Sequence, residues 1–292
     1  MTLYIKGLAV PTSLALSKEE LDKLKQRILQ SNMKRVQPKS TYEALRVSDG
    51  AIQLIIYKSG KVVHNDSPDS RKLLDDVLSA EMAYDYLIGT DEVGKGEWYG
   101  PLVVACVALR PKQIVDIRGL GVRDSKELER SRLMKLAQEL SRISFTRDLL
   151  TLMPEKYNQL YKEFSFEKKT LNDLLAWAHA SVIRRVLAEL GERRVKILID
   201  KFDVEKTELR LLTTAHVSDR TPNVEIIQTA SGDTEIPVSV ASILAKNEFE
   251  GRVAELERKF GVRLRGAKPD TVSREILPYV AKTHFKNVAA VD

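Results

Sequence analysis

The sequence has few of the residues that form disulfides or soft metal sites: Cys106 is the only cysteine, and there are four histidines among 292 residues. A single thiol cannot close an internal disulfide, and no Cys/His cluster has the spacing of a zinc site. Cys106 lies within the apolar run LVVACVAL, which predicts a small buried core residue. The pattern excludes a disulfide scaffold and a zinc-finger protein.

Long apolar runs are also missing. No run approaches the roughly 20 residues that cross a bilayer, and the N-terminus lacks the charged start and long apolar middle of a signal peptide. We therefore expect no membrane partner and a cytoplasmic location. With 43% hydrophobic and 30% charged residues, the composition is that of a globular protein. The length predicts two domains, or one domain with a sizeable appendage.

The net charge of +6 is modest, and it is compatible with a polyanionic partner without requiring one. Residues 1–80 contain 13 Lys/Arg and 9 Asp/Glu, so a net +4 falls in the first quarter of the chain. This favours an appended nucleic-acid-binding module, and a solvated basic surface without a partner explains the charge equally well.

Residues 1–80 predict a small α+β domain. A capping box at Ser17 and Glu20 begins a helix. Its apolar face is expected to hold Leu21, Leu24, Ile28 and Leu29. Strand-like runs TYEALRV and AIQLIIYKSGKVVHN follow, joined by a hairpin at Asp49–Gly50, and a second helix runs from Ser67–Pro68 to Leu78.

Residues 84–292 predict an α/β domain with a mixed sheet flanked by helices. Its strand-like runs are residues 85–92, 102–109, 143–150, 195–200 and 224–229. Helices are expected over residues 127–140, 166–190, 204–214, 236–259 and 270–282.

Two adjacent acids, Asp91 and Glu92, end the first of these strands, and a glycine-rich turn follows in VGKGEWYGP. Neighbouring strand residues point to opposite faces, so the two carboxylates should flank the strand end. The glycine spacing does not fit a dinucleotide fingerprint, and no helix opens after it. Taken alone, the pair also fits a hairpin turn with solvated acids.

Two further acids favour a functional site. Asp200 ends the run VKILID, and Asp233 follows VEIIQTASG, so three strands deliver carboxylates to one sheet end. Clustered carboxylates repel one another unless cations join them, and oxygen-only ligands suit Mg²⁺ or Mn²⁺. A basic partner surface beside such a site indicates phosphodiester chemistry, in which two metals hold the attacking water and the leaving oxygen.

Several separate segments resemble the type 2 ribonucleases H, and ribonuclease HIII more than HII. They are DEVGKGEWYGP, RDSKEL, YNQLYKEF, LNDLLAWAHASVI, IDKFDVEKTELRLL, ASILAK and THFKN. The resemblance covers about residues 84–292 and implies a ribonuclease H-like fold. By element order, residues 1–80 are similar to the TATA-box-binding-protein-like (TBP-like) domain that precedes the catalytic domain in ribonuclease HIII.

The resemblance implies metal ligands and substrate contacts residue by residue. Asp91, Glu92 and Asp200 match the first three catalytic acids, and the fourth is Asp233, with Glu235 in reserve. Residues matching substrate contacts are Gly94, Lys95, Gly96, Ser125 and Lys126. The glycine turn would meet ribose 2′-hydroxyls. Ser125 and Lys126 would hold phosphate, although this segment also reads as a helix N-cap.

The implied activity is metal-dependent hydrolysis of the RNA strand of RNA/DNA hybrids by a monomer, leaving 5′-phosphate and 3′-hydroxyl ends. Two alternatives stay open: cleavage at single ribonucleotides embedded in DNA, as in ribonuclease HII, and hybrid binding without catalysis. His179 is expected to be a hydrogen-bonded structural residue, and His284 a surface residue.

Overall fold

The computed structural model describes residues 12–16, 18–65, 67–78, 84–122, 129–200, 223–229 and 235–291. The chain forms two compact units. The first consists of Met1–Ala83 with Pro111–Gly121, and the second of Tyr84–Arg110 with Val122–Asp292. The first unit thus takes in a helix, α3 (Pro111–Gly119), that the sequence patterns did not predict.

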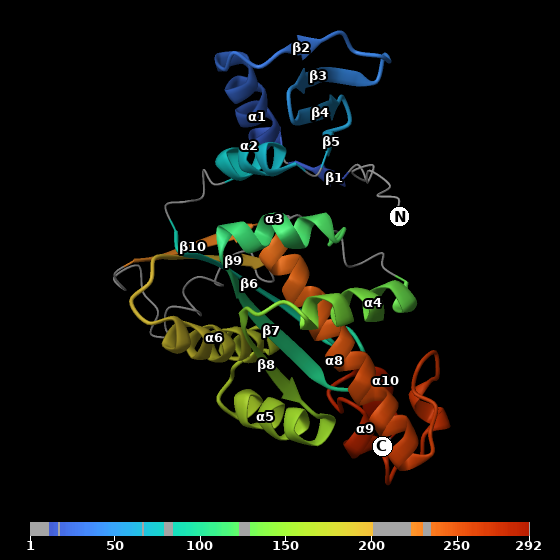
Figure 1. The fold of residues 1–292 in the computed structure, drawn as a ribbon. Coiled ribbons are helices and arrows are strands. Elements are labelled where there is room, and N and C mark those ends of the chain that lie inside the picture. Colours follow the sequence, from blue (N-terminus) through green and yellow to red (C-terminus); the bar gives the residue numbers. More distant parts are fainter. Residues whose placement is uncertain are drawn as a thin grey trace, which may run out of the picture. The chain divides into compact units, whose positions relative to one another are not determined.

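The first unit is an antiparallel sheet with helices, in the element order that the sequence predicts (Figure 1). Its elements are β1 (Thr12–Ala15), α1 (Lys18–Gln30), β2 (Arg35–Val36), β3 (Glu43–Asp49), β4 (Ile52–Tyr57), β5 (Lys61–His64) and α2 (Pro68–Leu78). The strand order is β1-β5-β4-β3-β2. Apolar side chains of α1, α2 and the sheet form one buried cluster, which includes Leu24, Ile28, Leu54, Ile56 and Leu74.

Local details of this unit test the sequence predictions. Ser67 caps α2 as expected, because its Oγ accepts the Ser70 N–H at 3.1 Å. Leu29 is 55% exposed, so the expected apolar face of α1 was too wide. The hairpin loop lies one residue later than predicted, since Asp49 pairs with Ile52 and leaves Gly50–Ala51 as the loop.

The second unit is built on a five-stranded mixed sheet in the order β10-β9-β6-β7-β8. The strands are β6 (Tyr86–Val93), β7 (Leu102–Leu109), β8 (Thr146–Leu152), β9 (Val195–Asp200) and β10 (Val224–Thr229). β6, β9 and β10 are parallel, whereas β7 is antiparallel to both β6 and β8. The predicted strands are confirmed, with β8 displaced toward its C-terminus.

Helices of the second unit pack on this sheet or extend from it (Figure 1). They are α4 (Arg130–Ser141), α5 (Pro154–Phe166), α6 (Leu171–Leu190), α8 (Ile236–Phe260), the 3₁₀ turn η4 (Pro269–Thr271), α9 (Leu277–Val280) and α10 (Lys286–Ala289). The α/β ribonuclease H-like class predicted from the sequence fits this arrangement.

Two helix predictions were wrong, and the prediction for residues 204–214 lies outside the described residues. The expected helix 166–190 is two helices, because Lys168 takes a positive φ of 58° and a new capping box forms at Thr170 and Asp173. The expected helix 270–282 is broken into η4 and α9, each beginning with a proline at its first turn.

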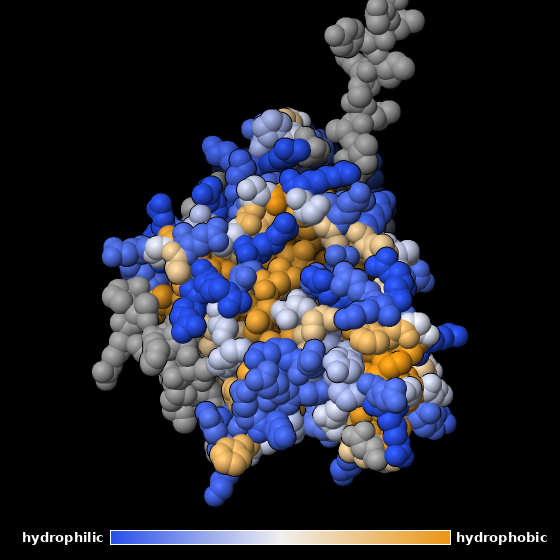
Figure 2. All heavy atoms as spheres, turned by 90° about the horizontal axis from the view of Figure 1, so that it is seen from below, coloured by the Kyte–Doolittle hydropathy of each residue, from blue (hydrophilic) through white to orange (hydrophobic). Residues whose placement is uncertain are grey.

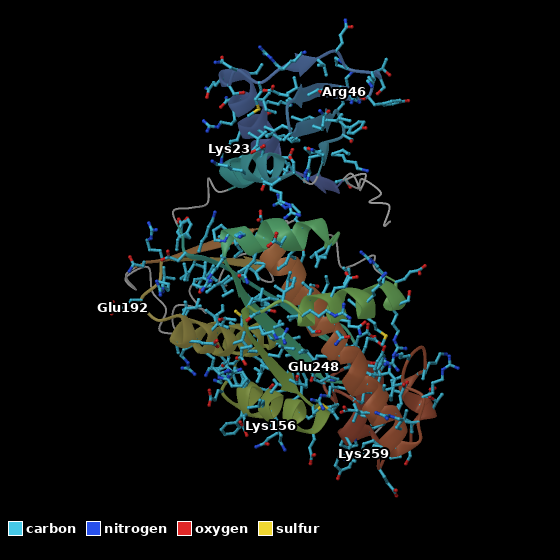
Figure 3. All side chains as sticks on the ribbon, viewed as in Figure 1. Lys23, Arg46, Lys156, Glu192, Glu248 and Lys259 are labelled. Carbon is cyan, nitrogen blue, oxygen red and sulfur yellow. The ribbon has the colours of Figure 1, made fainter. Side chains whose placement is uncertain are left out.

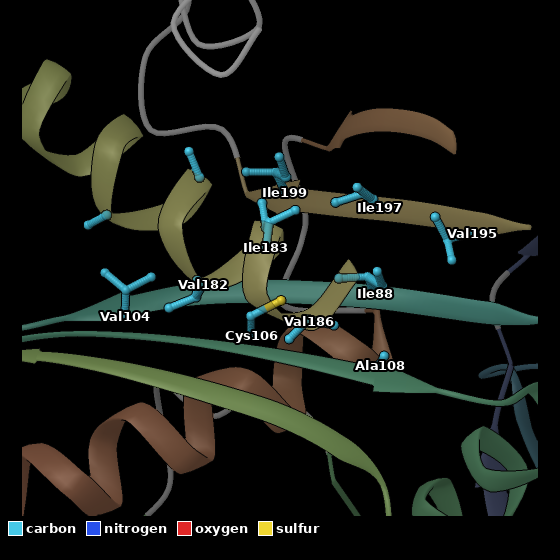
Figure 4. Packing of buried hydrophobic residues seen from close by; sticks show 12 residues of the cluster. Ile88, Val104, Cys106, Ala108, Val182, Ile183, Val186, Val195, Ile197 and Ile199 are labelled. Carbon is cyan, nitrogen blue, oxygen red and sulfur yellow. The ribbon is translucent and has the colours of Figure 1, made fainter. Parts of the chain in front are cut away.

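Alternation along β6 places α6 and α8 against different faces of the sheet. Ile88 belongs to the buried cluster that α6 forms with β7 and β9, shown in Figure 4. Gly89, the next residue, faces the start of α8, where an added Cβ would lie 2.2 Å from the carbonyl carbon of Pro237. Cys106 is fully buried in the α6 cluster, as predicted, and burial raises the pKa of its thiol.

Exposed charged side chains are found on both units, and Figure 3 labels Lys23, Lys156, Glu192 and Lys259 among them. Figure 2 shows one face as mostly hydrophilic, with a band of apolar atoms across its middle. Among the described residues, no helix combines the length and apolar character needed to cross a membrane.

Candidate active site

Asp91 and Glu92 lie at the carboxyl end of β6 and turn toward different helices. The Asp91 carboxylate accepts a hydrogen bond from Ser242 of α8. The Glu92 carboxylate lies beside His179 of α6, with Oε2 3.1 Å from Nε2. The predicted placement of the two acids on opposite faces of one strand is therefore confirmed, and each face supplies its own polar partner.

Neighbouring charge and burial act differently on the two carboxyl groups. Burial, reinforced by the adjacent Glu92 charge, raises the pKa of Asp91 to about 6. Burial also raises the pKa of Glu92, but the hydrogen bond from His179 and the charge of Lys95 outweigh it, so this pKa is lowered. The Lys95 ammonium lies 3.5 Å from Glu92 Oε1. The charged form of Glu92 is therefore stabilised, whereas ionisation of the Asp91 carboxyl group is disfavoured.

His179 links Glu92 to the interior of the sheet. Its side chain is 1% exposed, and Nδ1 lies 2.9 Å from Thr90 Oγ1. The Thr90 hydroxyl in turn donates to the carbonyl of Ala105 on β7 at 2.8 Å. The expectation of a hydrogen-bonded structural histidine is confirmed, and its contact with Glu92 also makes it a positioning residue for a candidate metal ligand.

The glycines that follow the acidic pair differ in whether the fold would accept a side chain at their positions. Gly94 has a φ of +93°, and an added Cβ would lie 2.2 Å from the Pro101 carbonyl oxygen. Gly100 also has a positive φ, and its Cβ would meet Val253 at 2.7 Å. Gly96 is exposed, and an added Cβ would meet nothing within 4 Å. The fold therefore requires glycine at positions 94 and 100 but not at 96.

Only part of the predicted ligand set falls within the described residues. The backbone of Asp200 ends β9, where the register pairs Thr90 with Ile199, so Asp200 follows at the level of Asp91. Asp233, Ser125 and Lys126 lie outside the described residues, as does the side chain of Asp200. Glu235, the reserve ligand, is the N-cap residue of α8 and forms no side-chain cap hydrogen bond. Within the described ranges, no three His, Cys, Asp or Glu side chains form a metal-binding group.

The described residues fit a hard divalent cation. Two adjacent carboxylates offer oxygen donors, which is the donor chemistry that Mg²⁺ and Mn²⁺ prefer. The pKa of Asp91 is raised first by burial and then by the Glu92 charge, and a bound cation would favour the charged form of this carboxyl group. Sequence reasoning found the acids and the segment ASILAK that contains Ser242, but it gave Ser242 no role and missed Gly89, because the contacts of both residues depend on how α8 packs on β6.

The sequence has clear relatives. A family model described as Ribonuclease HII matches residues 88–289. Ribonuclease HIII of Chlamydia felis is 30% identical over 302 residues, covering 96% of this chain and 96% of that protein. Ribonuclease HIII of Chlamydia abortus is 32% identical over 286 residues, covering 90% of this chain and 91% of that protein. The chain belongs to the ribonuclease HII and HIII family. It is accordingly a ribonuclease H-type hydrolase that acts as an endoribonuclease.

Solved structures of the same family share the fold. The structure described as Bst-RNase HIII in complex with Mn²⁺ aligns with a TM-score of 0.61 at 21% identity, covering 97% of this chain and 98% of that one. RNase H3 of Aquifex aeolicus aligns with a TM-score of 0.56 at 24% identity, covering 94% and 100%. At these identities the likeness supports the ribonuclease H-like fold and leaves residue roles to the site itself.

Proposed function

We propose that this chain hydrolyses the RNA strand of RNA/DNA hybrids with Mg²⁺ or Mn²⁺ held by Asp91, Glu92, Asp200 and Asp233. The observation that carries the proposal is the partly buried carboxylate pair at the end of β6, where Ser242 binds Asp91 and His179 binds Glu92. A cation bound between two carboxylates relieves their repulsion because it offsets both charges at once. The Mn²⁺ complex of Bst-RNase HIII supports the same class of metal.

The bound metals would activate the attacking water and stabilise the departing 3′-oxygen, which leaves 5′-phosphate and 3′-hydroxyl ends. The residues of the chain hold and orient this site. Ser242 fixes the Asp91 carboxylate from the α8 side, and His179 fixes Glu92 from the α6 side. Neither carboxylate needs to act as a covalent nucleophile in this proposal.

The turn formed by Gly94, Lys95 and Gly96 is proposed to meet the RNA strand. Gly96 supports this, because it is exposed and the fold itself leaves room for a side chain there. A missing Cβ at that position lets a sugar–phosphate backbone approach the peptide N–H groups closely. Ser125 and Lys126 are proposed as phosphate contacts on the resemblance alone.

Residues 1–80 are proposed to form a TBP-like domain that binds the hybrid through phosphate contacts, and residues 84–292 the catalytic domain. The basic excess of residues 1–80 supports electrostatic, salt-sensitive binding. Arg46 (Figure 3) is paired within this unit, because its guanidinium donates to both carboxylate oxygens of Glu43, and it is therefore not proposed as a phosphate contact. A monomeric state and a cytoplasmic location remain part of the same proposal.

A cleavage assay with three labelled duplexes tests the proposed substrate: a uniform RNA/DNA hybrid, DNA with a single embedded ribonucleotide, and plain DNA. We expect divalent-metal-dependent cutting of the hybrid, weak cutting at the single ribonucleotide and none of DNA. Preferred cutting at the single ribonucleotide would show that DNA with an embedded ribonucleotide, and not the hybrid, is the main substrate. Tight hybrid binding without cutting, in Mg²⁺ and in Mn²⁺, would leave only the binding function.

A further inference from the structure

Lys282 is a fully buried lysine outside the carboxylate site, with 0% of its surface exposed. A buried ammonium is costly unless each of its N–H groups finds a partner. All three are accounted for, since Nζ donates to the carbonyl oxygens of Glu97 at 3.0 Å, Tyr99 at 3.0 Å and Gly100 at 2.8 Å. These acceptors belong to a single loop, Glu97–Gly100, directly after the glycine turn.

The main chain around Lys282 is tied to the same loop. Its N–H donates to the Trp98 carbonyl at 2.7 Å, and the Gly100 N–H donates to the Val280 carbonyl at 2.9 Å. Tyr99 and Ala281 form an antiparallel bridge between these bonds. The segment 280–282 is therefore a short strand-like strip paired with the loop, and the lysine side chain reinforces that pairing.

A second element fixes the strip from its other side. Asn158 of α5 donates from Nδ2 to the Ala281 carbonyl at 2.9 Å and accepts the Thr283 N–H at Oδ1 at 3.0 Å. The ring of Tyr157, also on α5, lies 5.6 Å from Lys282 Nζ. These contacts with α5 hold the segment that carries Lys282 in place.

A positive charge at this point suits the loop for a simple electrostatic reason. Three carbonyl dipoles that point to one place repel one another, and a positive charge at their focus reverses that repulsion. The loop is continuous with the glycine turn, where the Glu97 N–H donates to the Gly94 carbonyl at 3.3 Å. A change in the path of Glu97–Gly100 would therefore change how Gly94–Lys95–Gly96 is presented.

We propose that Lys282 is a positioning residue for substrate: its ammonium sets the path of Glu97–Gly100 and so holds the glycine turn in the shape that receives the RNA strand. This inference rests on the proposed function, because it assigns the turn to the hybrid. Lys282 makes no contact with Asp91 or Glu92 among the described hydrogen bonds, so its effect falls on substrate binding more than on the chemical step.

The test compares steady-state cleavage of a uniform hybrid by wild type and Lys282→Met, which keeps the length of the side chain and removes all three donors. We expect KM to rise about tenfold and kcat to change less than about threefold, the pattern of lost uniform binding. Leu140→Ala is the matched control, since Leu140 is fully buried in α4, which contributes no residue to the loop. It should lower stability while leaving KM unchanged.

Hydrogen exchange of backbone amides in residues 94–100 supplies a readout that does not need activity. Exchange in the full-length, metal-free chain should be faster in Lys282→Met than in wild type, and unchanged in Leu140→Ala. If Lys282→Met does not fold, Lys282→Gln retains two N–H donors and should show a smaller rise in KM.

The outcomes separate the two proposals. Cutting by wild type, together with a higher KM and faster loop exchange in the Lys282 variant alone, supports the inference. Cutting by wild type with KM and loop exchange in the Lys282 variant no different from the Leu140→Ala control overturns the inference and leaves the proposed function in place. No cutting of the hybrid by wild type overturns the proposed function, and the role of Lys282 in RNA positioning falls with it.

Discussion

His179 and Glu92 meet across the junction of α6 and β6, with Nε2 3.1 Å from Oε2. The same imidazole contacts Thr90, two positions before Glu92 on the strand. The histidine therefore bridges the sheet interior and a candidate metal ligand, and it restrains the direction in which the Glu92 carboxylate points.

Replacing His179 with Asn should lower activity because the orientation of Glu92 is lost. Loss of a group that orients a metal ligand commonly costs about 10- to 100-fold in metal affinity or activity. The measurement is the Mg²⁺ concentration required for half-maximal cleavage, which we expect to rise. Ser181→Ala is the control, since Ser181 lies on the same helix and its hydroxyl donates to the Trp177 carbonyl at 2.7 Å. An unchanged Mg²⁺ requirement in His179→Asn would show that Glu92 is held by other groups.

Gly89 should not tolerate a side chain. An added Cβ would lie 2.2 Å from the Pro237 carbonyl carbon and 2.3 Å from the Val238 nitrogen, both in the backbone of α8. Gly89→Ala must therefore displace α8 and with it Ser242, and we expect a loss of about 2–4 kcal/mol in the free energy of unfolding. Urea unfolding measures it.

Gly251→Ala is the matched control for this variant. Gly251 lies within α8, where an added Cβ meets nothing within 4 Å. Alanine there should be neutral or stabilising by up to about 1 kcal/mol. Equal stability of the two variants would contradict the close packing of α8 on β6.

Gly96→Ala should separate a substrate effect from a structural one. Because its added Cβ meets nothing within 4 Å, the free energy of unfolding should stay within about 0.5 kcal/mol of the wild-type value. The KM for the hybrid should rise about tenfold. Gly94→Ala should instead destabilise the protein, since its Cβ would meet Pro101 and its φ is +93°. A normal KM in Gly96→Ala would remove the turn from the proposed substrate contacts.

Much of this architecture was predictable from short-range patterns. The strands were found because apolar runs and their ends are local features, and Asp91 and Glu92 were found because they follow such a run directly. The helix expected over residues 270–282 was wrong because the segment is broken between η4 and α9, and its end at Ala281 bridges to Tyr99 through a contact that periodicity does not encode. Lys282 illustrates the limit, since it lies 185 residues along the chain from one of its acceptors, Glu97.

Lys282 also predicts a pH dependence of stability. Burial lowers its pKa to about 7 from an ordinary value of 10.5, while the charge of Glu97 opposes the shift. The other groups around it are the Tyr157 ring and His284, whose pKa is lowered by burial and by the lysine charge. His284 is half-buried and stacks on Tyr161, with ring centroids 4.3 Å apart, so its expected surface position was wrong.

Below about pH 7 the folded chain carries the Lys282 ammonium that donates to the three carbonyls, and between pH 7 and 10.5 it releases this proton while the unfolded chain still holds it. The stability of wild type relative to Lys282→Met should therefore rise with pH across this window and be flat below it. Urea midpoints of both proteins at pH about 6.5 and about 9.5 measure the change. A constant difference between the two proteins would mean that the three carbonyls keep the lysine protonated throughout.

The central claim is that Asp91 holds a catalytic divalent cation, and calorimetric titration of the metal-free chain with Mn²⁺ tests it most directly. Asp148→Asn is the control, because Asp148 is an acid on β8 that pairs with Arg185. We expect wild type and the control to release or absorb heat on binding Mn²⁺ and to cleave the hybrid. Asp91→Asn should lose both the heat of binding and the cleavage. Wild-type Mn²⁺ binding retained in Asp91→Asn would contradict the central claim.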